Sequence, residues 1–411
     1  MSDAAPAPSQ RATERWRPWL EPPQPPEVER LLKIAAERPD IVSLAGGLPA
    51  DDLFPTEAVR ATLRHVMLER GAEALQYHWS DGYEPLRAQI GGLMRDLRGV
   101  EIAPEQLLIT HGAQQALDLI ARLLLRTGDP LAIESPTYPA AIQVFRLQRP
   151  RLLPVPRDEH GLDLAALADT LAAERPVAVY VATAGHNPTG GALEPDACRE
   201  LLDLCRTHDT LVIEDDAYGN VQFGAPHLPL RAYPGAEDRV LHVGSFSKIL
   251  SPGLRVGWLI APPAVLVQLQ RLKSAADLQT SSLSQIALST YLAEQDLRHH
   301  LERCRAHYRA RRDAMLAALA GTAPDGVRWT APVSGFSLWV SLPETLDALS
   351  LLAQAIDRGV AFEPGAAFFP ATSPTSYLRL SFSNNTPEAI ARGVPRLTRL
   401  LHEAIACETA A

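Results

Sequence analysis

The sequence is short of several residue types and motifs, and each shortage excludes a class of protein. It has only 4 cysteines in 411 residues, and none lie in a CxxC pair, so neither a zinc knuckle nor a disulfide framework is expected. No apolar run of about 18 residues occurs, so no membrane-spanning helix is expected. The motifs GxGxxG, GxxxxGK(S/T) and HExxH are absent. Dinucleotide-binding, P-loop and zinc-protease functions therefore have no support, and we expect no metal site.

Charge and composition narrow the class further. Hydrophobic residues make up 46% of the chain and charged residues 21%, which is enough apolar content for a substantial core. The formal net charge of −9, without a basic block, argues against nucleic acid or anionic membrane as the main partner. Residues 1–26 lack the pattern of a secretory signal and are rich in Pro and Ala, so we expect an extended arm. The cysteine content favours a reducing compartment, and hence the cytoplasm.

Lysine is the scarcest charged residue, because only 3 of the 39 basic residues are lysines. Chemistry that needs a side-chain primary amine thus has three candidates. Lys33 lies on an ordinary helical pattern and Lys273 in a charged helical stretch, whereas Lys248 follows an apolar strand in the hydroxyl-rich stretch GSFSKILSPGLRVGW. Unlike arginine, a lysine can lose its proton and form an imine with an aldehyde. The S-x-x-K pattern of penicillin-binding enzymes also matches here, but no lysine precedes Thr-Gly, so that interpretation is rejected.

Short apolar strands alternate with helical patterns in the middle of the chain. Strands are expected near residues 107–110, 131–134, 177–183, 211–214, 240–244 and 256–260, with helices between them, including 113–126 and 195–206. This alternation predicts a mostly parallel sheet covered by helices on both faces. A helix at 27–37 and a strand at 41–44 precede it. Beyond residue 283 a long helical stretch to 319, strands near 336–342, 360–362 and 378–382, and a last helix kinked at Pro395 predict a smaller α+β region.

Six motifs occur in one order along the chain: SLAGGLP, LQYHWSDGYEPLR, THGAQQALDLI, HNPTGG, EDDAYG and SFSKxLxPGLRVGW. Together they resemble the fold-type I pyridoxal-phosphate enzymes of the class I/II aminotransferase group, and the resemblance extends from about residue 41 to 405. The first three most resemble the 2-aminoadipate aminotransferase branch, and MocR-type regulators are similar too. The resemblance implies a mostly parallel seven-stranded sheet between helices, with a smaller α+β domain. We expect an arm at 1–26, a large cofactor-binding domain at 51–300, and a small domain made of 27–50 and 301–411.

The resemblance assigns roles to residues that follow the predicted strands. Lys248 would bind pyridoxal 5′-phosphate as an imine, Asp215 would pair with its pyridine nitrogen, and Asn187 and Tyr218 would hydrogen-bond its 3-oxygen. Independently of the resemblance, Asn187 and Asp215 come after neighbouring strands, and ligands of open parallel sheets bind beyond the carboxyl ends of the strands. Taken alone, Asn-Pro-Thr-Gly is typical of a β-turn, and the acidic triplet at 214–216 is typical of a helix cap or solvated corner.

The cofactor phosphate needs an anion site. Residues 112–114 open a helix directly after a strand, where free amides and the helix dipole favour an anion. The resemblance adds side chains, so the expected cofactor-binding set is Gly112, Ala113, Gln114, Tyr138, Ser245, Ser247 and Arg255, with Tyr138 stacking on the ring. His111 and Ala113 depart from the small polar residues common in the family beside this glycine, and Ala113 offers no hydroxyl.

The substrate side of the site is also implied by the resemblance. Arg379 lies in an apolar strand pattern, and the matching arginine of the family holds the substrate α-carboxylate as a bidentate fork. A structural salt bridge is the alternative, because a buried arginine needs a carboxylate partner. Gly47 and Asn187 are expected beside the substrate. Tyr77 resembles the tyrosine that reaches the phosphate in the neighbouring subunit, which implies a homodimer with shared sites.

These features predict an enzyme that transfers an amino group between an L-amino acid and a 2-oxo acid, with 2-oxoglutarate as one partner. One alternative keeps the cofactor but changes the reaction to decarboxylation, elimination, cyclisation or oxidation, because a fold does not determine which bond breaks. The other alternative is the effector-sensing module of a regulator. It is the least favoured, because fewer than 50 residues precede the match and they are proline-rich, unlike a helix-turn-helix domain.

Overall fold

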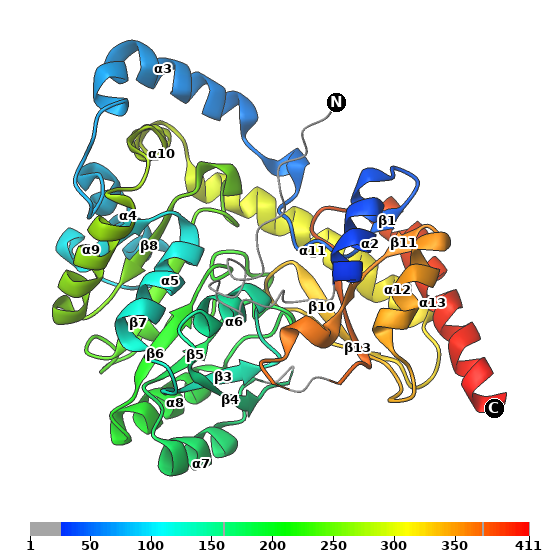
Figure 1. Cartoon of the computed structure of the whole chain (residues 1–411). Coiled ribbons are helices and arrows are strands. Elements are labelled where there is room, and N and C mark those ends of the chain that lie inside the picture. Colours follow the sequence, from blue (N-terminus) through cyan, green and yellow to red (C-terminus); the bar gives the residue numbers. More distant parts are fainter. Residues whose placement is uncertain (1–25, 159–160, 372–373, 411) are drawn as a thin grey trace, which may run out of the picture.

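A seven-stranded sheet is the largest feature of the computed structural model, which describes residues 26–158, 161–371 and 374–410 (Figure 1). Its strand order is β2-β8-β7-β6-β5-β3-β4, and β8 alone runs antiparallel to its neighbours. The strands are β2 (Leu107–Thr110), β3 (Pro130–Ser135), β4 (Arg151–Pro156), β5 (Ala178–Val181), β6 (Leu211–Asp215), β7 (Val240–Ser245) and β8 (Gly257–Ile260). The predicted mostly parallel sheet is confirmed.

Helices cover both faces of this sheet. Successive side chains of a strand point to opposite faces, and in β5 Tyr180 joins the apolar cluster of α5 and α6, whereas Val179 joins that of α7 and α8. The helices of this part are α3 (Thr56–Ala74), α4 (Glu84–Arg98), α5 (Gly112–Leu124), α6 (Pro139–Arg146), α7 (Leu164–Glu174), α8 (Pro195–Thr207), α9 (Pro263–Asp277) and α10 (Ser282–Glu294). Apart from the edge strand β4, which is partly exposed, the strands are mostly buried on both faces, as their near-continuous apolar sequences predict.

A second, smaller α+β unit combines the two ends of the described chain (Figure 1). Its antiparallel sheet has the order β12-β13-β10-β9, and β1 pairs in parallel with β11. The strands are β1 (Val42–Ser43), β9 (Arg328–Trp329), β10 (Ser337–Ser341), β11 (Val360–Ala361), β12 (Glu363–Pro364) and β13 (Tyr377–Ser381). The helices are α2 (Pro26–Glu37), α11 (Leu297–Thr322), α12 (Ala348–Asp357) and α13 (Pro387–Ala410). The domain limits given above remain a prediction.

Two local features differ from the sequence-based expectations. The long helix expected to reach residue 319 is two helices, α10 and α11, because Asp296 caps α11 by accepting from the amide of His299 at 3.1 Å. Strand β4 was not predicted, since it contains Pro154 and Pro156; it lies at the sheet edge, where proline is tolerated. Pro395 lies inside the last helix, α13, and the kink expected at this residue stays a prediction.

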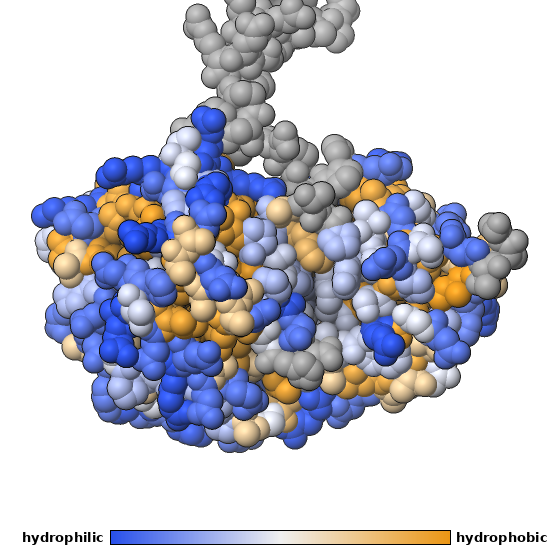
Figure 2. Space-filling view, turned by 90° about the horizontal axis from the view of Figure 1, so that it is seen from below, coloured by the Kyte–Doolittle hydropathy of each residue, from blue (hydrophilic) through white to orange (hydrophobic). Residues whose placement is uncertain are grey.

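The surface of the described part of the protein is mainly polar on the face that Figure 2 shows. Hydrophilic residues cover most of the face seen from below, and apolar residues form separate patches on it (Figure 2). Among the described residues, no helix is both long enough and apolar enough to cross a bilayer. The predicted arm, apart from Pro26, lies outside the described residues.

Candidate active site

Most of the predicted site residues line one cavity of about 530 Å³. Because β5, β6 and β7 are parallel, their carboxyl ends meet at one edge of the sheet, and the cavity lies there. Its lining includes Gly47, Ala113, Gln114, Tyr138, Asn187, Asp215, Tyr218, Ser245, Ser247, Lys248, Arg255 and Arg379. Two predicted residues are not in this lining: Gly112 begins α5 beside Ala113, and Tyr77 is 76% exposed on the surface.

A larger hollow of about 910 Å³ lies elsewhere in the molecule. Arg157, Trp329, Trp339 and Tyr377 are among its described lining residues, and it shares none with the smaller cavity. No lysine and no predicted site residue is in that described lining. The predicted site residues, with Lys248 among them, therefore gather in the smaller cavity.

Lys248 follows β7 and its amine lies inside the cavity. The Nζ atom donates to the carbonyl of Gly47 at 3.4 Å and lies 5.5 Å from the ring centre of Tyr218. Burial, and then the neighbouring Arg379 charge, lower the pKa of Lys248 to about 8. About one amine in ten is then uncharged at pH 7, which an exposed lysine does not approach. Lys248 is thus suited to act as a nucleophile and as a base.

The other two lysines are placed differently. Lys33 is exposed on α2. Lys273 is buried on α9, and its Nζ donates to Asp277 Oδ1 at 2.8 Å and Oδ2 at 3.0 Å. Burial lowers the pKa of Lys273, and the hydrogen bonds to Asp277 oppose this fall. Neither Lys33 nor Lys273 is in the described lining of the cavity, so neither competes with Lys248 for amine chemistry there.

Asp215 ends β6, and its carboxylate is buried in the cavity wall. Its Oδ2 accepts from the hydroxyl of Tyr180 at 2.8 Å, and its Oδ1 accepts from the amide of Ala217 at 3.3 Å. Burial raises the pKa of Asp215, while these two hydrogen bonds favour the ionised form and limit the rise. Tyr180 was not predicted as a site residue, because in the sequence it is one more residue of an apolar strand.

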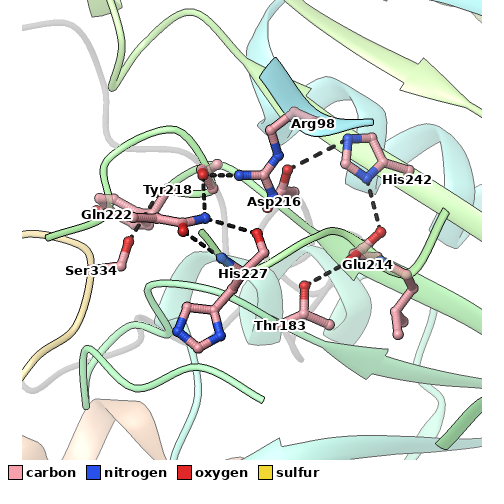
Figure 3. Close-up of polar contacts among 12 residues, drawn as sticks. Arg98, Thr183, Glu214, Asp216, Tyr218, Gln222, His227, His242 and Ser334 are labelled. Carbon is pink, nitrogen blue, oxygen red and sulfur yellow. Dashed lines mark hydrogen bonds and ion pairs between the residues drawn. The ribbon is translucent and has the colours of Figure 1, made fainter. Parts of the chain in front are cut away.

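The acidic neighbours of Asp215 are each committed to another partner (Figure 3). The carboxylate of Glu214 lies 2.9 Å from His242 Nδ1, and Asp216 Oδ1 accepts from Arg98 Nη2 at 3.0 Å. His242 Nε2 lies 3.8 Å from Asp216, so the imidazole stands between the two carboxylates. All four side chains are buried, and a buried charge without a partner would be strongly destabilising, so each of these groups requires its pairing. Asp215 is therefore the carboxylate of this triplet that faces the cavity.

The turn that carries Tyr218 is held by the same network (Figure 3). Arg98 Nη1 donates to the carbonyl of Gly219, which also accepts from Gln222 Nε2 at 2.6 Å. Ser334 Oγ donates to the carbonyl of Tyr218 at 3.2 Å. Burial raises the pKa of Tyr218 to about 12, so its phenol keeps its proton and can donate to an acceptor in the cavity.

An anion cradle forms where α5 begins. Gly112 has φ of +70°, and a Cβ atom there would lie 3.0 Å from Arg255 Nη2, so this turn requires glycine. The first amides of α5 have no carbonyl one turn earlier and can bind an anion. Arg255 donates to the carbonyl of His111 at 3.1 Å, and Ser245 donates to Ser247 at 2.9 Å. One guanidinium, two hydroxyls and a helix N-terminus thus converge.

Arg379 enters the cavity from the small unit, on β13. Its Nη1 donates to Asn187 Oδ1 at 3.0 Å, and its Nη2 donates to the carbonyl of Ala45 at 2.7 Å. Nη2 also contacts the carboxylate of Glu363, which faces Arg379 across the β12–β13 pair. The structural ion pair considered above therefore exists, and Arg379 also lines the cavity.

These groups fit the cofactor that the family resemblance implies. Pyridoxal 5′-phosphate needs a cradle for a dianion, a carboxylate for a protonated ring nitrogen, and an amine for its aldehyde. The α5 N-terminus with Arg255, the buried Asp215 and the pKa-lowered Lys248 supply these three, and Tyr138 adds an aromatic ring to the wall. The cavity volume is within the range of small-molecule sites.

Comparison with known proteins agrees with this geometry. The sequence model of the family "Aminotransferase class I and II" matches residues 39–397. A 2-aminoadipate transaminase of Thermus thermophilus is 42% identical over 91% of this chain and 93% of its own length, and an aromatic-amino-acid aminotransferase of Thermococcus litoralis is 37% identical over 92% and 91%. The crystal structure of alpha-aminoadipate aminotransferase from T. thermophilus, complexed with N-(5′-phosphopyridoxyl)-L-leucine, superposes with a TM-score of 0.88. That structure is 41% identical in sequence, and the match covers 96% of this chain and 99% of that one.

Proposed function

The chain belongs to the class I and II aminotransferases and is a pyridoxal-phosphate-dependent enzyme, and we propose that the cavity around Lys248 is where it exchanges an amino group between an L-amino acid and a 2-oxo acid. The assignment of the site depends mainly on one observation. A lysine with a pKa lowered to about 8, the carboxylate of Asp215 and the guanidinium of Arg379 line the same cavity. These groups supply the nucleophile, the ring partner and the substrate anchor that transamination needs.

Each residue has a defined task in this proposal. When bound, pyridoxal 5′-phosphate supplies an aldehyde carbon that combines with amines and a ring that withdraws electrons from the substrate Cα. Asp215 keeps the ring nitrogen protonated, and Arg379 binds the substrate α-carboxylate. Lys248 removes the proton from the Cα atom as a general base and returns a proton as its conjugate acid. Its lowered pKa keeps both forms accessible near neutral pH.

The remaining site residues hold the cofactor and the substrate in place. Asn187 and Tyr218 would donate to the ring oxygen, and Tyr138 would pack against the ring. The anion cradle would hold the phosphate through the amides of Gly112, Ala113 and Gln114 and the side chains of Ser245, Ser247 and Arg255. Gly47 lies beside the substrate carboxylate, because a Cβ atom there would lie 3.4 Å from Arg379 Nη1. The small unit and the large sheet thus both contribute to one site.

We also propose a homodimer in which Tyr77 completes the site of the partner subunit. Tyr77 is exposed and outside the cavity of its own chain, and Trp79 beside it is 81% exposed. The amide of His78 donates to Gln279, which places exposed Leu278 next to this segment. An apolar surface of this kind is typical of a protein–protein interface. The cytoplasm remains our proposed location, from the cysteine content.

A two-step experiment tests the function. The cofactor-loaded protein, given one amino acid without oxygen, should release one equivalent of the matching 2-oxo acid per site and stop. Adding a second 2-oxo acid should then yield its amino acid, which is the pattern of a ping-pong reaction. A panel of amino acids covers the unknown donor. Turnover that consumes oxygen, or that releases carbon dioxide or ammonia, would instead support another pyridoxal reaction.

A further inference from the structure

The buried lysine of α9 has no task in the proposed function. The side chain of Lys273 is fully buried, and lysine is almost never fully buried unless it is paired. Its Nζ atom donates to both carboxylate oxygens of Asp277, one turn further along the same helix. Asp277 is the last residue of α9, and Leu278 after it has φ of +62°, a strained value for leucine. Such strain persists only where the surrounding contacts fix the backbone, so the position of Asp277 is firmly determined.

Asp277 connects this ion pair to the start of α5. Its Oδ2 atom accepts from Gln115 Nε2 at 2.7 Å, and His111 Nε2 lies 3.6 Å from the same oxygen. The other end of the Gln115 carboxamide faces the main chain, where Oε1 accepts from the amide of His111 at 2.9 Å. Because an ionised carboxylate can only accept, Asp277 determines which end of this carboxamide faces His111. A continuous chain of contacts therefore links Lys273 to the residue at which α5 begins.

His111 directly precedes the anion cradle, and both of its main-chain polar groups are held. Its amide donates to Gln115, and its carbonyl accepts from Arg255 Nη2 at 3.1 Å. Gly112 follows with φ of +70°. Since the amide of His111 is already bonded to Gln115, the amides left for an anion are those of residues 112–114. The contact between Gln115 and His111 therefore fixes the turn from which these amides project.

The contribution of these contacts to anion binding is one of position and not of charge. The charges of Lys273 and Asp277 cancel, and burial lowers the pKa of His111, so its imidazole is mostly uncharged at neutral pH. Arg255 remains as the cation that lines the cavity here. Ala113 has no hydroxyl to offer a phosphate. The main-chain amides must therefore supply more of the phosphate binding, and their exact placement matters more.

We propose that Gln115 is a positioning residue which, held by Asp277 and Lys273, sets the geometry of the amides at residues 112–114 for the phosphate of the cofactor. This inference rests on the proposed function and deepens it, because it concerns the cofactor end of the same cavity. Gln115, Asp277 and Lys273 are all outside the described lining of that cavity, so they act through the main chain of α5. The inference also gives Lys273 a task, which is to hold the carboxylate of Asp277 beside α5.

The test compares two ligands that differ only in the phosphate group. Dissociation constants of pyridoxal 5′-phosphate and of pyridoxal are measured by equilibrium dialysis against the cofactor-free, full-length protein, for the wild type and for Gln115→Met. Methionine keeps the length and the neutrality of the side chain but removes both hydrogen bonds. The variant should bind pyridoxal 5′-phosphate about tenfold more weakly, because polar groups at the cradle lose their partners. The dissociation constant of pyridoxal should change by less than about twofold, since pyridoxal does not use the cradle.

Two further variants separate the cradle from general packing. Gln89→Met is the matched control, because Gln89 is also half-buried and donates to the carbonyl of Ser289 at 2.9 Å, but lies on α4 outside the cavity lining. It should leave both dissociation constants unchanged. Lys273→Met combined with Asp277→Leu replaces the ion pair by apolar side chains, which buried ion pairs often tolerate, and should cause the same selective loss. Adding Gln115→Met to this pair should weaken the binding of pyridoxal 5′-phosphate by less than about twofold more, because both changes interrupt one chain of contacts.

The possible outcomes distinguish the inference from the proposed function. An equal loss for both ligands in Gln115→Met, no loss for either, or the same loss in Gln89→Met would each overturn the inference while leaving the proposed site intact. Losses that add in the combined variant would show that the ion pair acts independently of Gln115, and would overturn it too. A wild-type protein that binds pyridoxal as tightly as pyridoxal 5′-phosphate would overturn the proposed anion cradle, and the inference with it.

Discussion

Replacing Tyr180 by phenylalanine should shift the acid limb of the pH–activity profile upward. The hydroxyl of Tyr180 donates to Asp215 Oδ2 at 2.8 Å, and both side chains are buried. Burial already raises the pKa of Asp215, and this hydrogen bond opposes the rise by favouring the ionised carboxylate. Without the hydroxyl the pKa rises further. At a given pH below neutral, a smaller fraction of Asp215 is then ionised and able to keep the ring nitrogen protonated.

The magnitude follows from the strength of one hydrogen bond to a charged group. Such a bond contributes about 1.5 to 3 kcal/mol, and about 1.4 kcal/mol corresponds to one pKa unit. The acid limb should therefore move up by about one to two pH units. Phenylalanine keeps the ring that packs edge-on against Phe145 at 5.3 Å, so the core should remain filled.

The assay is the pH dependence of kcat/KM for the first half-reaction, measured with the cofactor-loaded enzyme. Tyr291→Phe is the matched control, because Tyr291 is also a buried tyrosine but lies on α10, outside the cavity lining. The control should leave the acid limb in place. A Tyr180→Phe profile that superimposes on the wild-type profile, or an equal shift in both variants, would refute the assigned role of this hydrogen bond.

Three further predictions concern the other site residues. Lys248→Ala should abolish nearly all turnover, since Lys33 is exposed and Lys273 is paired with Asp277; borohydride reduction followed by peptide mapping should find the cofactor on Lys248, and an adduct on another lysine would contradict the assignment. Mixing inactive Lys248→Ala with impaired Tyr77→Ala protomers should restore activity towards half the native value per hybrid dimer, because one intact site forms; hybrids without recovery would exclude shared sites. Arg379→Ala should lower kcat/KM of both half-reactions by an amount equivalent to about 2 to 5 kcal/mol, because the substrate carboxylate loses its anchor; an effect confined to one half-reaction would argue against a common carboxylate site.

The order of elements and the main site were predictable because both depend on local patterns. The strands β2 to β8, apart from the proline-containing β4, appear in the sequence as short, mostly apolar runs of four to six residues. Stretches with helical periodicity separate most of these runs. Asp215 and Lys248 were predictable because each lies at, or a few residues beyond, the carboxyl end of one of these strands. The parallel arrangement then brings them to one edge of the sheet without any knowledge of side-chain contacts.

The contacts between distant segments were not predictable from the same patterns. Arg98 and Asp216 are separated by over a hundred residues, and no periodicity indicates that they pair. Glu363 lies on a two-residue strand, and only its register with Arg379 places it in the cavity. The role of Tyr180 depends on the face of β5 to which it points, and a continuous apolar strand does not reveal that face.

The pairing of β1 with β11 has a consequence for how the chain acquires its structure during synthesis. Val42 pairs with Val360, so the ribosome must add 318 residues after Val42 before its partner exists. At typical elongation rates this takes roughly 15 to 65 s. All strands of the large sheet lie between these two positions and can form in that interval. The apolar segment around β1 must meanwhile wait without its partner strand, and an unpaired apolar segment of this kind is prone to aggregation.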